Sequence, residues 1–185
     1  CANPLVFIRA QSLGMKGNES AAEIDANKEL CATIEKIRSH AAVIFGLVDK
    51  PEDASRLSPY NPFFSIVSEP SDYVTPDGKQ IKSDSIDIVS RLLFMLKMHK
   101  THPGTGTVCL GVAARIPGTI VNKLLKKEAH NREKIYIGHP AGIIPVESKV
   151  EEKEGSFHVT RAAIYRTARR ILDGNVYVKN TIINI

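Results

Sequence analysis

The 185-residue sequence lacks any feature that would place it in a membrane or direct it out of the cell. No apolar run approaches the roughly 18 residues that a transmembrane helix needs. The chain does not open with the charged and then apolar segment of a signal peptide. We therefore expect a soluble, cytoplasmic protein without a membrane partner.

Cysteine is scarce, and its spacing excludes two kinds of site. Cys1, Cys31 and Cys109 are odd in number and far apart, and none belongs to a C-x-x-C or C…H pattern. The sequence thus indicates neither a disulfide framework nor a zinc site, and reduced, mostly buried thiols are expected. We expect no metal ion and no cofactor.

A concentrated basic stretch is also missing, although the net charge is +5. Lysine and arginine are dispersed along the chain, and the segment KLLKKEAHNREK interleaves acids with bases. This pattern is typical of a solvated surface, and we expect no nucleic-acid partner.

The sequence does contain enough apolar residues for a core. Its 43% hydrophobic and 24% charged residues are typical of a globular protein. A chain of this length buries roughly 70% of its unfolded surface. There is no internal repeat and no low-complexity region, so one α+β domain over residues 1–185 is the economical interpretation.

Residue patterns predict several elements in the first part of the chain. The segments PLVFIRA and NPFFSIVSE have the β-branched and aromatic content of strands. Apolar residues recur at helical spacing from Lys28 to Phe45, and Gly46 ends the predicted helix. Residues 47–62 carry three prolines and are expected to form a loop, and TPDGK a turn.

The later part of the chain is less definite. KIYIGHPAGIIPVESKV is typical of two short strands around a Gly-His-Pro-Ala-Gly turn, and EEKEG of a charged hairpin tip. IDIVSRLLFMLKMH fits either a buried strand or a helix. FHVTRAAIYRTARRILDGNVYVK fits one long strand with a DGN turn, or a strand, a helix and a strand.

The stretch HPGTGTVCLGVAARIPGT, residues 102–119, joins a glycine-threonine turn to an apolar and therefore buried helix. It lacks the lysine of a P-loop, and its glycine spacing and missing acidic partner argue against a dinucleotide site. Glycines that free backbone N–H groups at a helix start favour a small anion such as a carboxylate. The alternative is that the turn only leads the chain into the helix.

Four blocks of the sequence, in order, resemble the methylaconitate isomerase (PrpF) family over nearly the whole chain. They are ANPLVFIRAQSLGMKGNE, DIVSRLLFMLKMHKTHPGTGTVCLGVAARIPGT, IYIGHPAG and YRTARRILDGNVYV. The resemblance implies the fold of diaminopimelate epimerase and proline racemase, in which two similar domains each wrap a mixed, barrel-like sheet around one central helix. It makes segment 86–98 a strand, begins the central helix near Thr105, and places the active site in the cleft between the domains.

The family's chemistry shifts a carbon–carbon double bond in small di- and tricarboxylic acids by proton transfer, which needs an acid/base pair and groups that bind carboxylates. The family takes its lysine and cysteine from the first-domain motifs G-G-T-S-K-G, T-S-K and S-G-N-C-G-N, and none of these occurs here. The chain therefore resembles only the C-terminal half, and we assign it no catalytic residue. Pro103 stands where the epimerase branch has a catalytic cysteine, and Cys109 falls inside the helix as a packing residue or, alternatively, a chemical one.

The resemblance and the anion argument together give a set of candidate substrate-binding residues. They are Asn3, Phe94, Met95, Gly104, Thr105, Gly106, Thr107, His139, Pro140 and Ala141. Phe94-Met95-Leu96 replaces a common S-M-G, and Gly138-His139-Pro140-Ala141-Gly142 replaces G-H-P-S-G. Two hydroxyl groups are thereby lost, so we expect a more apolar pocket than is usual in the family.

Several candidates have a structural alternative. Asn3 could form an Asx turn before Pro4, Phe94 and Met95 could belong to the core, and His139 could be a turn residue and not a general base. Lys97 and His99 could face the cleft or the solvent. One arginine could bind a carboxylate, but the sequence does not select among Arg161, Arg166, Arg169 and Arg170.

We expect the chain to supply the carboxylate-binding half of such an isomerase and to be inactive alone. Its partners would be a small carboxylic acid and either the missing N-terminal domain or a second copy of the chain. The contact would be made by a cleft face that exposes Phe94 and Met95. The alternative is a non-catalytic small-carboxylate-binding or interaction domain derived from the same fold.

Overall fold

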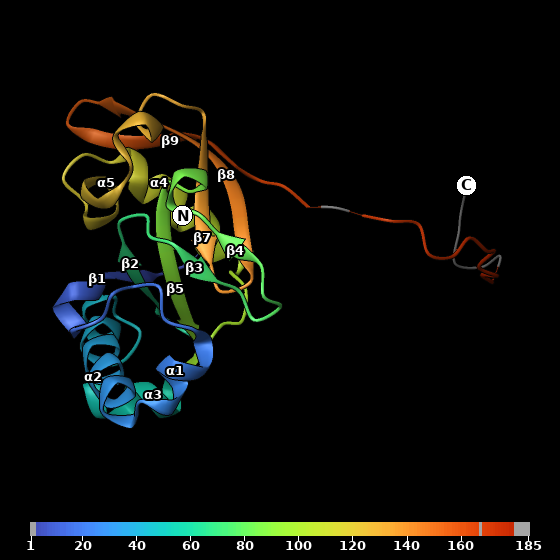
Figure 1. Ribbon diagram of the computed structural model, residues 1–185. Coiled ribbons are helices and arrows are strands. Elements are labelled where there is room, and N and C mark those ends of the chain that lie inside the picture. The colour runs from blue at the N-terminus through green and yellow to red at the C-terminus, as the bar shows by residue number, and fades with distance from the viewer. Residues whose placement is uncertain (1–2, 167, 180–185) are drawn as a thin grey trace.

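The computed structural model describes residues 3–166 and 168–179, which form an α+β arrangement (Figure 1). Its strands are β1 (Leu5–Arg9), β2 (Phe63–Ser68), β3 (Tyr73–Val74), β4 (Gln80–Ile81), β5 (Ile88–Phe94), β6 (Lys97–Met98), β7 (Lys134–His139), β8 (Gly142–Lys153) and β9 (Ser156–Ile164). Its helices are α1 (Ala21–Ala26), α2 (Lys28–Ile44), α3 (Ala54–Leu57), α4 (Gly104–Arg115) and α5 (Ile120–Leu124). None of these helices is both long and apolar enough to cross a membrane.

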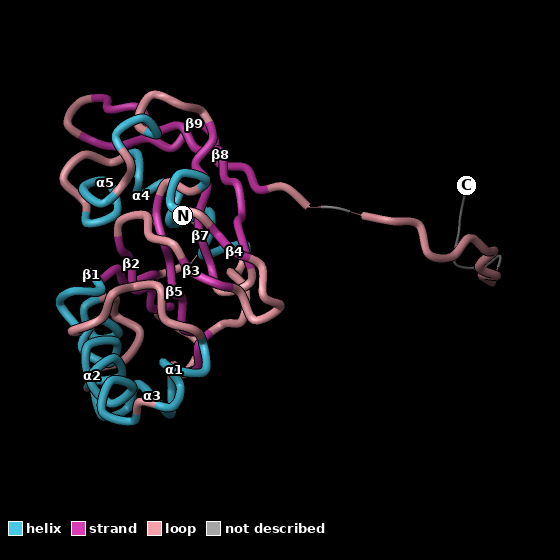
Figure 2. Tube along the Cα trace, in the orientation of Figure 1, coloured by secondary structure: helices cyan, strands magenta, loops and turns pink. Residues whose placement is uncertain are grey.

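The main sheet is mixed, with the strand order β1-β2-β5-β7-β8-β9 (Figure 2). β6 pairs with β5. The pairs β1–β2 and β5–β7 are parallel, and the other neighbours are antiparallel. β3 and β4 form a separate hairpin around the predicted TPDGK turn.

The sheet curls around α4. Leu110 and Ala114 of this helix belong to one buried cluster with apolar residues of four strands, namely Val67, Ile88, Ile135, Ile137 and Val146 of β2, β5, β7 and β8. A flat sheet would not bring so many strands against one helix, so the sheet forms a half-barrel with α4 inside it. The predicted fold, a barrel-like sheet wrapped around a central helix, is confirmed.

Two glycines allow α4 to lie directly on the sheet. A Cβ atom at Gly106 would stand 2.5 Å from Leu92 Cδ1, and one at Gly111 would stand 2.8 Å from Val146 Cγ2. Because glycine disfavours a helix by about 1 kcal/mol relative to alanine, burial and not propensity stabilises α4. The helix begins at Gly104, one residue before the predicted start.

The helices α1, α2 and α3 lie together at one end of the sheet (Figure 1). The predicted helix 28–45 is confirmed as α2, which Asn27 caps through the Leu30 N–H at 3.0 Å. It ends before Gly46, which has a φ of +68°. Helix α1 was not predicted, although Ser20 and Glu23 form a capping box in front of it.

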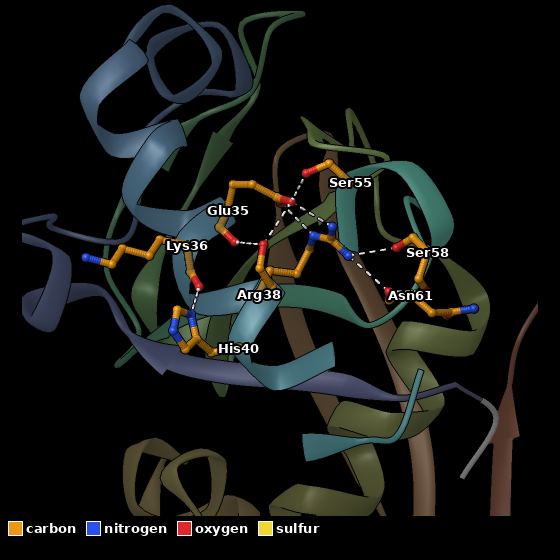
Figure 3. Close-up of polar contacts among 8 residues, drawn as sticks. Glu35, Lys36, Arg38, His40, Ser55, Ser58 and Asn61 are labelled. Carbon is orange, nitrogen blue, oxygen red and sulfur yellow. Dashed lines mark hydrogen bonds and ion pairs between the residues drawn. The ribbon is translucent and has the colours of Figure 1, made fainter. Parts of the chain in front are cut away.

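The buried side chain of Arg38 joins α2 to the following loop (Figure 3). Arg38, only 4% exposed, donates to the Glu35 carboxylate at 2.6 and 2.7 Å and to the carbonyl oxygens of Ser58 and Asn61, each at 2.9 Å. Burial raises the pKa of Glu35, but the hydrogen bonds from Arg38 and Ser55 outweigh this and hold the pKa below its ordinary value. The loop is therefore fixed immediately before β2.

The structure decides segment 86–98, which the sequence left open, and confirms the predicted strands around the Gly-His-Pro-Ala-Gly turn. Segment 86–98 is a strand, β5, followed by a tight turn at Met95 and Leu96, whose φ values are +54° and +60°, and by β6. The two strands around the Gly-His-Pro-Ala-Gly turn are β7 and β8, and Glu154 and Gly155 turn the chain between β8 and β9.

The strand that both predictions for FHVTRAAIYRTARRILDGNVYVK begin with is confirmed as β9, but the rest of this segment differs from both predictions. β9 ends at Ile164, and residues 165–166 and 168–179 form neither helix nor strand. Figure 1 shows this segment running away from the sheet, and its Ile171 and Tyr177 side chains are 88% and 93% exposed. The other predicted elements are absent because no other part of the described chain covers these apolar side chains.

Candidate functional site

The first turn of α4 carries three N–H groups that have no partner in the described part of the chain. Pro103 precedes the helix and offers no side-chain cap, and the first turn contains no acidic residue. The amides of Gly104, Thr105 and Gly106 donate to no atom of the described residues. Free donors at the positive end of a helix favour an anion.

Thr107 does not belong to this set of free donors. Its N–H donates to the Pro103 carbonyl oxygen at 2.8 Å, and its fully buried hydroxyl donates to the same oxygen at 2.9 Å. The candidate Thr107 therefore offers no free N–H group, because Pro103 supplies the acceptor for the first helical hydrogen bond.

A hollow of about 510 Å³ opens beside this turn. It is lined by His99, Thr101, His102, Pro103, Gly104, Ile144, Ile164, Tyr165 and Arg166. The Arg166 guanidinium lies over the turn, since its Nη2 atom would be 3.3 Å from a Cβ atom at Gly104. A second positive group thus stands next to the positive helix end, in an arrangement that suits a carboxylate.

The structure distinguishes the four candidate arginines. Arg161 pairs with Glu147, whose carboxylate is buried, at 2.5 Å, and Arg170 pairs with Asp173 at 3.2 Å. Arg169 lies in the exposed C-terminal segment. Arg166 is the one of the four that lies at the start of α4.

Asn3 also reaches this turn. Its Nδ2 atom is 3.4 Å from the Thr105 hydroxyl, and its carbonyl oxygen accepts a hydrogen bond from the Cys109 thiol at 3.1 Å. Cys109 is buried and lines a separate, mostly apolar hollow of about 440 Å³ between β1 and α4. This position favours the packing role for Cys109, while Cys1 lies outside the described residues.

Phe94 and Met95 stand further from the turn. The Phe94 ring packs edge-on against Phe63 at 5.0 Å between centroids, and a Phe63 ring carbon would be 3.8 Å from a Cβ atom at Gly106. Phe63 therefore lies between Phe94 and the start of α4. Met95 lies in the β5–β6 turn and is 49% exposed, and of the two only this side chain is largely open to solvent.

His139 is the last residue of β7, and Pro140 and Ala141 form the turn to β8. His139 is 8% exposed, and its Nδ1 atom accepts the Ala141 N–H at 3.3 Å. Burial, with Arg91 nearby, lowers the pKa of His139 to about 4, so this ring is neutral near pH 7. The three residues do not line the hollow beside α4, and the geometry favours the turn role for His139.

Lys97 and His99, the two candidates that could face either the cleft or the solvent, differ in their surroundings. Lys97 is exposed on β6, whereas His99 lines the hollow and its Nδ1 atom accepts the Thr101 N–H at 3.1 Å. Sequence reasoning missed His102, which lies beneath the hollow and is 6% exposed. The signal that the sequence offered was the position of His102 directly before Pro103, next to the predicted helix start.

The described residues bring backbone amides and a guanidinium together, and these are groups that can bind an anion. In residues 3–166 and 168–179 no three His, Cys, Asp or Glu side chains gather closely enough to hold a metal ion. The arrangement can bind and orient a small carboxylate through amides and a guanidinium.

Comparison with known proteins gives a consistent picture. The family described as "PrpF protein" matches residues 1–179. The chain is 46% identical over 179 residues to 3-methylitaconate isomerase of Eubacterium barkeri, covering 96% of this chain and 46% of that protein. It is 33% identical over 175 residues to 2-methyl-aconitate isomerase of Shewanella oneidensis, covering 95% and 43%.

A solved structure agrees with these sequence matches. The crystal structure of methylitaconate-delta-isomerase superposes with a TM-score of 0.86 at 45% identity, covering 97% of this chain and 46% of that one. The chain thus spans about half the length of the curated relatives that it matches.

Proposed function

The chain belongs to the PrpF family, and from this premise we propose that it forms the C-terminal, substrate-binding domain of an isomerase that shifts a C=C bond in small di- or tricarboxylic acids. The related proteins named 3-methylitaconate and 2-methyl-aconitate isomerase support this class of substrate. The observation that carries the proposal is the first turn of α4, where three N–H groups have no partner among the described residues and Arg166 lies beside Gly104.

In this function the α4 turn holds one carboxylate of the acid. The amides of Gly104, Thr105 and Gly106 donate to its oxygens, and Arg166 adds a positive charge. The helix dipole contributes up to about 2 kcal/mol when such a site is partly buried. Binding by this half alone is therefore weak, in the millimolar range, or about 4 kcal/mol.

The proton-transfer pair belongs to the other half of the protein. The motifs that carry the family's lysine and cysteine are absent from this sequence, and proton transfer between carbon atoms needs no redox cofactor. The partner is a first domain that contains them, joined at the face that bears the α4 turn. The unpaired thiols of Cys31 and Cys109 support a reducing, cytoplasmic setting.

A single backbone donor tests the proposal. Thr105→Pro removes one N–H group, and proline is tolerated in the first turn of a helix. Gly104 precedes it and has no Cβ atom to clash with the proline ring. Thr105→Ala is the matched control, because it removes the hydroxyl that Asn3 contacts but keeps the N–H.

Citrate or aconitate titrated into the ¹⁵N-labelled chain should shift the amides of Gly104, Thr105 and Gly106. The Thr105→Pro variant should lose this response, and Thr105→Ala should keep it. Shifts that gather on the arginines of the C-terminal segment and spare the turn would contradict the carboxylate site.

Activity distinguishes the enzyme from a non-catalytic carboxylate-binding domain. The chain alone should not isomerise methylaconitate-type acids, and adding a separately expressed PrpF first domain should restore turnover. Citrate binding without any restored turnover would favour the non-catalytic alternative.

A further inference from the structure

A chain of buried hydrogen bonds runs from the centre of the sheet to the first turn of α4. Ser65 of β2 and Ser90 of β5 are fully buried, with their hydroxyl oxygens 2.9 Å apart. Ser90 Oγ is 2.9 Å from His102 Nε2, and His102 Nδ1 is 2.8 Å from the Thr107 hydroxyl oxygen. Thr107 completes the chain by donating to the Pro103 carbonyl.

Counting protons fixes the direction of each bond on the helix side. A carbonyl oxygen can only accept, so the single hydroxyl proton of Thr107 lies on the bond to Pro103. The Thr107 oxygen must therefore accept from His102, and Nδ1 of His102 carries a proton.

The hydroxyl groups of Ser65 and Ser90 indicate whether Nε2 of His102 is protonated. If Nε2 is bare, Ser90 donates to it and Ser65 donates to Ser90, so both hydroxyl protons are used. If Nε2 carried a proton, Ser90 would have to donate to Ser65, whose own proton would find no acceptor in the described residues. A buried donor without a partner costs about 1–3 kcal/mol, which favours the bare Nε2.

The surroundings of the ring favour the same state. Burial is the main effect and lowers the pKa of His102 to about 3, and His139, His99 and Arg91 add to it. The His139 ring is 6.4 Å away, and neither ring nitrogen of His102 contacts a carboxylate of the described residues.

We propose that His102, as a neutral imidazole with its proton on Nδ1, is a positioning residue that aims the three free N–H groups of α4 at the ligand. Its ring lies beneath the turn, since Cε1 would be 3.8 Å from a Cβ atom at Gly106. Because both ring nitrogens are engaged, it holds Thr107 and the first turn against β2 and β5 and does not exchange protons with a substrate. The aiming role rests on the proposed function, whereas the hydrogen-bond chain does not.

The tautomer can be measured without any ligand. In the ¹⁵N-histidine-labelled chain, His102 should show a protonated Nδ1 and a bare Nε2 that do not change between pH 8 and pH 5. An Nε2–H tautomer, or titration of this ring in that range, would overturn the inference even if citrate binds.

Two substitutions separate positioning from packing. His102→Asn places an amide donor where Nδ1 stood and keeps the bond to Thr107, while His102→Gln places an acceptor near Ser90 and loses the bond to Thr107. Exposed His40→Gln is the control. If His102 positions the turn, citrate binds roughly fivefold more weakly to the Gln variant, the equivalent of one hydrogen bond of about 1 kcal/mol, and nearly normally to the Asn variant.

A purely structural role gives a different result. Both variants would then lose thermal stability while citrate affinity stayed at the wild-type value, and this outcome would refute the positioning role. If citrate does not bind the wild-type chain at all, the proposed function and the aiming role both fail, and the tautomer measurement still decides the hydrogen-bond chain.

Discussion

Replacing Arg115 with lysine should weaken the fold at the far end of α4. Arg115 is the last residue of this helix, and its guanidinium uses all five N–H groups on backbone carbonyl oxygens. The acceptors are Ser148 at 3.1 Å, Ala129 at 2.9 Å, His130 at 3.0 Å, Glu133 at 3.1 Å, and Arg132. This one side chain therefore fixes the loop 129–133 and β8 to the central helix.

The size of the effect follows from the donors that are lost. A lysine ammonium has three donors, so at least two carbonyls lose their partner. Because several of these carbonyls can turn to water, we discount each bond to about 1 kcal/mol and expect Arg115→Lys to lower the free energy of unfolding by about 2–3 kcal/mol. For a chain of this size the melting midpoint then falls by roughly 4–12 °C.

Urea unfolding followed by circular dichroism measures this directly. Arg56→Lys is the control, since Arg56 pairs with Asp53 at 2.8 Å and its side chain is 71% exposed. Its expected cost is below about 0.5 kcal/mol. The reasoning is refuted if Arg115→Lys and Arg56→Lys unfold at the same urea concentration.

Two further predictions concern the stability of the fold at low pH and the substitution of two glycines. In the unfolded chain His102 and His139 become protonated below about pH 6.5. In the folded chain their pKa values are about 3 and about 4, so both rings stay neutral until the pH is much lower. The free energy of unfolding should therefore fall as the pH drops through that window, by about 2 kcal/mol per histidine at pH 5, and urea titrations at pH 8 and pH 5 should show it. Gly17 has a φ of +98°, and a Cβ atom there would be 2.2 Å from Ser68 Oγ, whereas Gly14 has a φ of +69° and open space around its Cβ position. Thermal unfolding should therefore show that Gly17→Ala lowers the free energy of unfolding by about 1–3 kcal/mol more than Gly14→Ala.

The sequence predicted elements well where local pattern and burial agree. β1, β2 and α2 follow directly from residue content and spacing. β5 could not be told from a helix by its pattern, because six of its seven residues are buried and no alternation remains; the family resemblance resolved it. The segment after Ile164 was predicted wrongly because its apolar side chains have no partner within the described chain.

The candidate site shows the same division. The glycine turn was evident from the sequence, since helix starts have local signals. Selecting Arg166 among four arginines required the fold, because its neighbour Gly104 is remote in sequence. His102 was missed for the same reason, since its partners Ser65 and Ser90 lie on other strands and only the strand pairing brings them together.

The parallel pairing of β1 with β2 has a consequence for the order in which the molecule assembles. β7, β8 and β9 follow one another through tight turns, so their contacts close short loops. β1 can pair with β2 only after the whole segment between Arg9 and Phe63 has folded back, and this pairing closes a far longer loop. Because long-range pairs form late, we expect the β7–β9 meander to lead folding and β1 to dock last. Asn3 precedes β1, so the contact that it makes with Thr105 becomes established only at the end of folding.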